Sequence, residues 1–225
     1  ITPWTIDNDG NNKCSGSPVI VDIFVEPTVV ITAASDTICD GEATSIVVSS
    51  INSATRGIRY TWTVTDNPAV EGASSSTGQG QLIGTPIVQT LNNTSDDYQV
   101  VQYTITPWTI DNDGNNKCSG SPVIVDIFVE PTVVITAASD TICDGEATSI
   151  VVSSINSATR GIRYTWTVTD NPAVEGASSS TGQGQLIGTP IVQTLNNTSD
   201  DYQVVQYTIT PWTIDNDGNN KCSGS

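Results

Sequence analysis

Several short stretches of the chain alternate hydrophobic and polar residues, which is the pattern of half-buried β-strands. The clearest are 58–64 (IRYTWTV) and 123–129 (VIVDIFV), and in 101–105 every second residue is apolar. In 123–129 we expect Val123, Val125, Ile127 and Val129 to line one face. We expect the other face to be partly exposed. Its residues are Ile124, Asp126, Phe128 and Glu130. Weaker patterns predict strands within 29–33, 44–49 and 82–91.

A turn signal and the absence of a helical period set the fold class. The run DNDGNN at 111–116 lies between two strand patterns and favours a hairpin turn. About seven short strands in about 100 residues are typical of an immunoglobulin-like sandwich. The sequence therefore predicts an all-β fold built from Greek-key β-sandwich domains.

The chain repeats itself without substitution. The stretch 1–17 recurs at 105–121 and at 209–225, and 18–104 recurs at 122–208, so the step is 104 residues. A repeat of this length is the size of a whole domain rather than of a solenoid unit. Identical copies cannot carry different active sites, so we expect them to multiply length or valency.

The proline that follows Glu26 and Glu130 marks the domain boundaries, because proline ends a strand and stiffens a junction. We predict that 1–27 is the last hairpin of a preceding repeat and that 28–131 is one complete repeat. The remainder, 132–225, is a repeat that lacks its last strand. Such short linkers predict domains arranged as a rod, and the missing strand would leave an unpaired edge that a following segment fills.

Composition narrows the classes of partner. The formal net charge is −17, which repels nucleic-acid phosphates and anionic lipid heads but suits divalent cations and solubility. No apolar run approaches the roughly 20 residues of a membrane span. The chain begins inside a strand pattern without a signal peptide, so we expect a part of a longer polypeptide.

The five cysteines favour an oxidising compartment. We expect disulfides between Cys39 and Cys118 and between Cys143 and Cys222, with the partner of Cys14 outside the sequence. One objection is that the two sulfurs of each pair would lie at opposite ends of a plain sandwich. Pairing across domains, pairing between chains and free thiols therefore remain alternatives.

Oxygen ligands at alternate loop positions suit Ca²⁺, and each repeat offers one such loop. The residues are Asp7, Asp9 and Asn11, with their equivalents Asp111, Asp113 and Asn115, and Asp215, Asp217 and Asn219. The distal glutamate of an EF-hand is absent. The alternative interpretation is an Asx-rich turn with Gly114 at a positive φ.

Two kinds of tryptophan differ in expected role. Trp62 lies on the clearest strand pattern and is expected in the core. Trp4, Trp108 and Trp212 follow a proline near the hairpin, and they are candidates for packing or for contact with a ligand or neighbouring chain. No histidine is present to activate a serine, and no catalytic residue is assigned.

Three signatures carry a family resemblance. They are TICDG at 37–41, YTWTV at 60–64, and YTITP at 103–107 followed by KCSGSPVIVDIFVEP at 117–131. Their order resembles the PKD-like, immunoglobulin-like repeats of very large surface proteins of Bacteroidota. The resemblance implies export by the type IX secretion system, an extracellular location, and a role as an adhesin or filament without catalytic residues.

Two functional hypotheses follow. In the first, the repeats are structural and give length and stiffness to a surface stalk or filament, with identical repeats as partners in a homo-oligomer or fibre. In the second, each repeat binds a surface glycan with the tryptophan and the Asx-rich loop, with or without calcium. No cofactor other than Ca²⁺ is expected.

Overall fold

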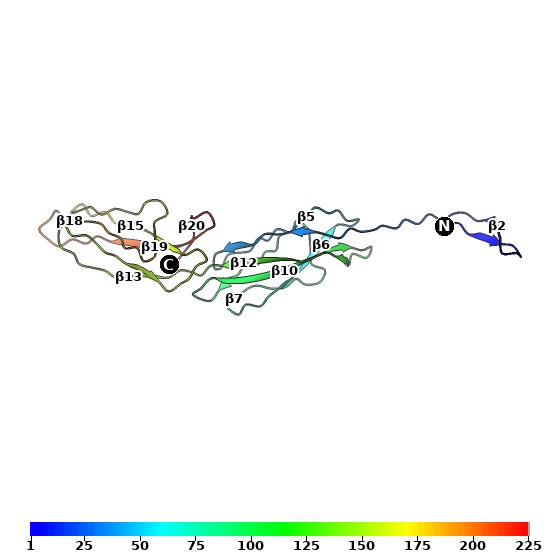
Figure 1. Cartoon of the computed structure of the whole chain (residues 1–225). Helices are drawn as coiled ribbons and strands as arrows, with labels where there is room; N and C mark the ends of the chain where they lie inside the picture. The colour runs from blue at the N-terminus through cyan, green and yellow to red at the C-terminus, as the bar shows by residue number, and fades with distance from the viewer. Residues whose placement is uncertain (225) are drawn as a thin grey trace.

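The computed structural model describes residues 1–224, which form β-strands and no helix. The predicted all-β class is therefore confirmed. In Figure 1 an N-terminal hairpin, a first repeat (28–131) and a second repeat (132–224) follow one another along the long direction of the view. None of the described residues belongs to a helix with the length and hydropathy needed to cross a membrane.

The strands fall into three groups along the chain. The N-terminal hairpin contains β1 (Trp4–Ile6) and β2 (Asn12–Ser15). The first repeat contains β3 (Ile31–Thr32), β4 (Asp36–Ile38), β5 (Ser49–Ser50), β6 (Ile58–Val64), β7 (Val70–Glu71), β8 (Gln81–Leu82), β9 (Asn92–Asn93), β10 (Gln99–Ile110), β11 (Asn116–Ser119) and β12 (Val123–Val129). The second repeat contains β13 (Ile135–Ala137), β14 (Val152–Ser154), β15 (Ile162–Val168), β16 (Val174–Glu175), β17 (Gln185–Leu186), β18 (Asn196–Asn197), β19 (Tyr207–Ile214) and β20 (Asn220–Ser223).

The first repeat is a sandwich with one long sheet. Its strand order is β4-β12-β10-β6-β8, with β11 also paired to β10. Strand β12 is antiparallel to β10 and parallel to β4, so it lies between them. Short pairs, β3 with β5 and β7 with β9, and the bridges Ala43–Thr90 and Ile46–Ile87 complete the fold.

The core of the first repeat consists of the apolar faces that the alternation predicted. Tyr60 is 0% exposed and Trp62 is 8% exposed, as expected for β6. Val125, Ile127 and Val129 of β12 join the same buried cluster. Glu130 does not match the prediction of a partly exposed residue. Its side chain is fully buried because it turns into the contact with the second repeat, described below.

The second repeat has the same sequence but fewer strand residues. Strand β10 begins at Gln99, whereas β19 begins at Tyr207, although the equivalent of Gln99 is Gln203. The stretch 140–142, equivalent to β4, is not a strand. Both differences have one cause. Among the described residues the second repeat has no counterpart of β12, and β12 supplies the hydrogen bonds that make these neighbours strands.

Candidate functional site: the junction between the repeats

The linker between the repeats is packed rather than free. Glu130 and Pro131 are buried, and Val133 is 1% exposed. The backbone N–H of Glu130 donates to the carbonyl of Ile38, which holds the start of the linker against β4. The peptide connection therefore leaves the first repeat in a fixed direction.

A disulfide joins the two repeats beside this linker. Cys39, directly after β4, is bonded to Cys222 of β20, with an S–S distance of 2.04 Å and a Cα–Cα distance of 5.6 Å. The two residues are 183 positions apart in the sequence. The bond therefore connects the first loop of one repeat to the last hairpin of the next.

This connection corrects the expected pairing of Cys39 with Cys118 and of Cys143 with Cys222. Cys39 lies next to the end of the sheet where Val129 pairs with Gln99, whereas Cys118 lies where β11 pairs with Trp108. Nine residues of β10 separate these ends, which is about 30 Å at the rise of a strand. The two sulfurs of one repeat therefore cannot meet. The disulfide forms across the two domains instead of within one.

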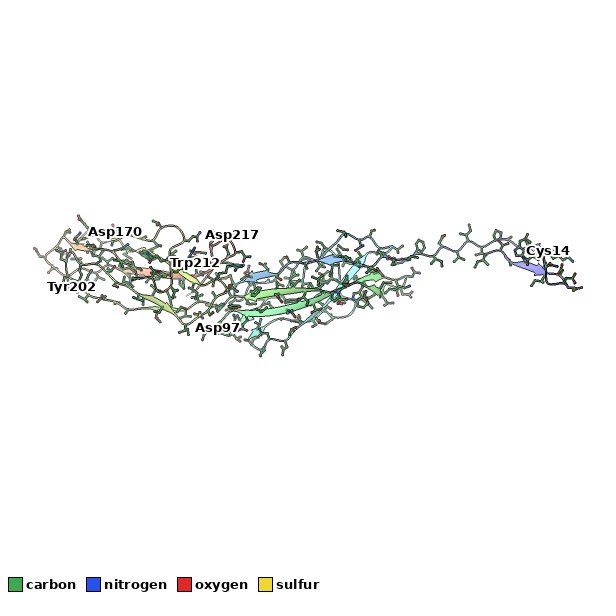
Figure 2. The ribbon with its side chains drawn as sticks, in the orientation of Figure 1. Cys14, Asp97, Asp170, Tyr202, Trp212 and Asp217 are labelled. Carbon is green, nitrogen blue, oxygen red and sulfur yellow. A yellow bond between two sulfur atoms is a disulfide. The ribbon has the colours of Figure 1, made fainter. Side chains whose placement is uncertain are left out.

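Among the described residues Cys14, Cys118 and Cys143 are unpaired, and all three are exposed. Cys14 lies in the N-terminal hairpin, far from the rest of the chain in Figure 2. Its expected partner lies outside the sequence and stays a prediction.

Local hydrogen bonds position both bonded cysteines. The backbone N–H of Cys39 donates to the carboxylate of Glu42 at 2.9 Å, and that of Cys222 donates to Thr213 Oγ1 at 3.2 Å. Gly41, with a φ of 75°, makes the intervening turn, a conformation that glycine adopts without steric cost. The geometry of the disulfide is thus set within each repeat.

A second set of contacts joins the loop before β10 to the second repeat. Ser157 donates its N–H to the carbonyl of Asp96 and accepts the N–H of Tyr98, at 3.1 and 2.8 Å. Asn156 Nδ2 also donates to the carbonyl of Asp96 at 3.1 Å. These bonds form a short parallel bridge between Asp97 and Ser157.

Polar side chains close the remainder of the junction. The carboxylate of Glu130 accepts the N–H of Thr159 at 3.1 Å, and Lys221 Nζ donates to the carbonyl of Thr37. Desolvation by burial raises the pKa of Glu130, while the hydrogen bond from Thr159 and the nearby positive charges act in the opposite direction. A buried carboxylate is stable only when it is hydrogen-bonded, and Thr159 supplies that bond.

Asp40 ties the linker to the same loop as Cys39. Its carboxylate accepts the hydroxyl of Thr132 at 2.7 Å and the N–H of Asn93 at 2.8 Å. Sequence reasoning did not identify Asp40, Glu42, Ser157 or Thr159 as junction residues. The only local signal was the polar run DGE at 40–42 beside a cysteine. This run does not show which part of the neighbouring repeat it contacts.

The candidate calcium loops form Asx turns. In 111–115 the carboxylate of Asp111 accepts the N–H groups of Asp113 and Asn115 at 2.9 and 2.8 Å, and Gly114 has a φ of 82°. The hydrogen bond from Asn115 lowers the pKa of Asp111. Over residues 1–224 no three His, Cys, Asp or Glu side chains are arranged to hold a metal ion. Calcium binding to Asp113 or its equivalents stays a prediction.

The tryptophans near the hairpin are not brought into one site. Trp108 and Trp212 are partly buried, and their Nε1 atoms donate to Thr61 and Thr165 at 3.0 Å. Trp4 is 48% exposed. The structure therefore places Trp108 in side-chain packing across β6 and β10.

A comparison of the sequence with models of known protein families shows to which family the chain belongs. The model of the PKD-like domain matches residues 36–133 and 140–225, which is more than half of the chain. The chain belongs to the PKD-like domain family. No curated protein matches it. The matched ranges include Cys39, Cys143 and Cys222, so each PKD-like domain contributes to the junction.

Proposed function

We propose that this chain is a structural segment of a secreted cell-surface stalk or extracellular filament, in which each PKD-like domain is fixed to the next. The observation that carries the proposal is the disulfide between Cys39 and Cys222. A covalent bond beside a packed linker removes the rotation that a single peptide connection would allow. Length and stiffness are the properties that identical, fixed repeats provide.

The junction supports a stiff connection at several separate places. The disulfide, the Asp97–Ser157 bridge and the Glu130–Thr159 hydrogen bond surround the linker. Relative motion of domains is the ordinary expectation when few contacts cross a linker. Here any hinge motion would have to break these contacts together, so we propose a rod-like arrangement.

An extracellular location suits the same chemistry. Disulfides persist in oxidising compartments, and PKD-like domains are typical of extracellular structural or adhesion proteins. They are typically non-catalytic, so we propose a structural role rather than an enzymatic one. Membership of a type IX-secreted adhesin of Bacteroidota belongs to this proposal and rests on the three sequence signatures. The glycan-binding alternative stays a prediction.

Small-angle X-ray scattering of the dilute, oxidised chain tests the stiffness. We expect one narrow distribution of long dimensions, matching the structure. The comparison is a loosened variant that combines Cys39→Ser with a flexible Gly-Ser insertion between Pro131 and Thr132, which should give a broad distribution. The proposal fails if the wild-type chain is as variable in length as the loosened variant.

A further inference from the structure

Each repeat has an uncharged outer surface on the layer that lies opposite the long sheet. In the first repeat β3 pairs with β5, and the bridges Ala43–Thr90 and Ile46–Ile87 join the segment before β5 to the segment before β9. The inward side chains of this layer, among them Ile46 and Ile87, belong to the core. The outward side chains alternate with them. We call this surface the apolar face, and its apolar members are Val30, Val47, Ile51, Pro86 and Val88, with serine and threonine between them.

The apolar face is exposed even where a neighbouring repeat is in place. Val47 and Val88 are 53% and 60% exposed although the second repeat follows them. Val134 and Ile155, the equivalents of Val30 and Ile51, are 49% and 78% exposed although the first repeat precedes them. The junction therefore leaves the face open in both repeats. A contiguous apolar patch of this kind is typical of a surface that contacts another molecule.

The apolar face has no charge, although the chain is strongly acidic. The segments that form it, 27–35, 43–55 and 72–95, contain no Asp, Glu, Lys or Arg, whereas the whole chain has 24 acidic and 7 basic residues. The outer face of the long sheet differs, because it carries Arg59 and Asp126. A charged group buried against the apolar face would find no counter-charge there. The surface that covers this face should therefore be uncharged as well.

The two ends of the apolar face carry opposite charges. Arg56 follows Ile51 after a short loop, and Glu42 lies before the first residue of the same segment. Glu42 and Ile51 are nine positions apart, which is about 30 Å at the rise of a strand. Glu42 and Arg160, the equivalent of Arg56, both stay exposed beside the junction. Each face therefore has an accessible basic end and an accessible acidic end.

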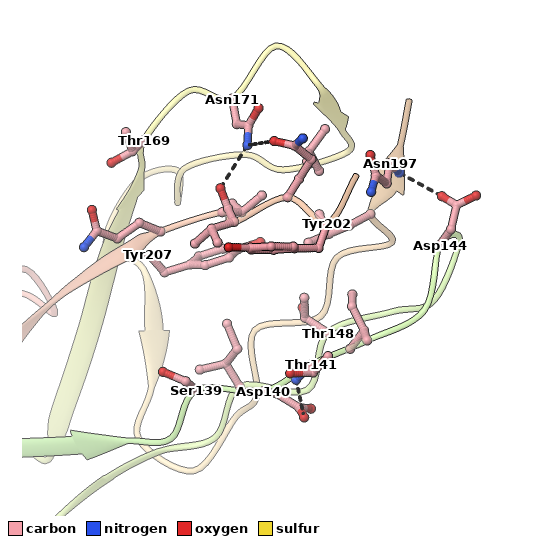
Figure 3. Close-up of a pocket in the computed structure, with 18 of the residues that line it drawn as sticks. Ser139, Asp140, Thr141, Asp144, Thr148, Thr169, Asn171, Asn197, Tyr202 and Tyr207 are labelled. Carbon is pink, nitrogen blue, oxygen red and sulfur yellow. Dashed lines mark hydrogen bonds between the residues drawn. The ribbon is translucent and has the colours of Figure 1, made fainter. Parts of the chain in front are cut away.

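Backbone hydrogen bonds hold the acidic end in place. In the second repeat the carboxylate of Asp144 accepts the N–H of Asn197 at 2.8 Å, a contact that Figure 3 shows, and its equivalent Asp40 makes the same contact in the first repeat. Glu42 accepts the N–H of Cys39 at 2.9 Å. The carboxylates thus keep a fixed position relative to the apolar face.

We propose that the apolar face of a repeat packs against the apolar face of a repeat in a second copy, with the two chains antiparallel, so that stalks or filaments associate side by side. Two sheets pack face to face at about 10 Å. The antiparallel orientation places Arg56 of each copy opposite Glu42 of the other, whereas a parallel orientation places like charges together. A two-fold axis makes such a contact complementary to itself.

The size of the face also selects a second copy as the partner. Three strands about 4.8 Å apart and about 30 Å long offer about 400 Å². A stable dimer buries about 800 Å² on each partner. One pair of repeats therefore makes a weak contact, and lasting association needs contacts at several repeats. A partner that repeats in the same way supplies them, because each further contact forms at a high effective concentration.

Analytical ultracentrifugation tests the contact. The chain with Cys14, Cys118 and Cys143 replaced by Ser should associate reversibly as its concentration rises, without disulfides between chains. Val47→Lys combined with Val151→Lys puts a charge into the middle of both faces. This pair should weaken the association by about tenfold or more, because a buried unpaired charge is costly. It should not lower the melting temperature, because both side chains are half exposed.

The matched control places the same charges on the other sheet. Leu82 and Leu186 are both 52% exposed, and they lie on β8 and β17, which pair with β6 and β15. Leu82→Lys combined with Leu186→Lys should leave the association unchanged. Monomers at every concentration, or an equal loss of association in the two double variants, would overturn the proposal.

Chemical cross-linking tests the antiparallel orientation. Arg56→Lys keeps the positive charge and supplies an amine that a carbodiimide joins to a carboxylate in contact with it. In a mixture of unlabelled and isotopically labelled chains, mass spectrometry should find position 56 of one chain linked to 40–42, or to the equivalent 144–146, of another. The link should disappear when Val47→Lys and Val151→Lys are added. No such link between associated chains, or a link that persists in that variant, would refute the antiparallel contact.

This inference rests on the proposed structural role, and the experiments separate their failures. The scattering test measures stiffness inside one dilute chain, whereas the association tests measure contact between chains. A stiff chain that stays monomeric would remove the side-by-side contact alone, and a flexible chain that still associates through the apolar face would remove the stiffness alone.

Discussion

Cys39 and Cys222 are 183 positions apart in the sequence, and their disulfide closes a covalent loop whose ends are 5.6 Å apart at their Cα atoms. Most of both repeats lies inside this loop. A load applied to the two ends of the chain therefore passes along β3 and β4 to Cys39 and from there directly to the last hairpin, so the residues between Cys39 and Cys222 do not carry it.

This relationship predicts a difference in single-molecule force spectroscopy. In the oxidised chain, pulling on the termini should never release the residues inside the loop. Reduction, or Cys39→Ser, should add an extension of about 600 Å, since a stretched chain gains at most about 3.5 Å per residue. Cys118→Ser is the control and should behave as the oxidised wild type. Full extension under oxidising conditions would contradict the connectivity.

The same loop predicts a loss of stability. In the chain-entropy description, closing a loop of this length stabilises the folded state by about 5 kcal/mol, because it restricts the unfolded chain. Cys39→Ser combined with Cys222→Ser should therefore lower the free energy of unfolding of the linked repeats by a few kcal/mol. Denaturant titration measures this value, and Cys14→Ser should leave it unchanged.

The burial of Glu130 at the junction leads us to expect that the unfolding free energy depends on pH. Its pKa is raised by burial, so the folded state holds the proton more tightly than the unfolded state. Its contribution to stability is therefore greatest below the unfolded pKa, about 4.3, and falls as pH rises through the folded pKa. Glu130→Gln should remove this decline. Denaturant titrations of both chains over this range should give a difference in unfolding free energy that changes with pH, and a constant difference would refute it.

Gly120 predicts a steric effect at the start of β12. A Cβ at this position would lie 1.9 Å from the carbonyl oxygen of Val29, so Gly120→Ala must displace backbone. Overpacking of this kind typically costs about 1–3 kcal/mol. The matched control is Gly16→Ala, because the nearest atom there is a side-chain carbon of Pro3, at 2.8 Å. Thermal unfolding should show a clear loss for Gly120→Ala and a smaller one for Gly16→Ala.

Local patterns in the sequence predicted the strands that form the core. The alternation in 58–64 is sufficient because the side chains of a strand point to opposite faces, so burial follows from spacing alone. The same holds for 123–129. The two residues of β7 and of β9 were not predicted, because so short a strand has no period.

The junction could not be predicted in the same way. Whether Cys39 meets Cys118 or Cys222 depends on the length of β10 and on the surface that the next repeat presents, neither of which is contained in cysteine spacing. The objection that the sulfurs lie at opposite ends of a sandwich was the useful signal. It left pairing across domains open as an alternative, and that pairing is the one that forms.

The junction also gives the array a polarity. Cys39 and Ser157 belong to unlike surfaces. One repeat contributes the loop after β4 and the loop before β10, and the other contributes its last hairpin and the loop that contains Ser157. A head-to-tail contact between unlike surfaces produces an open series with two different ends unless its rotation closes a ring. Nothing in such a contact limits the number of units, so length is set by how many copies are supplied.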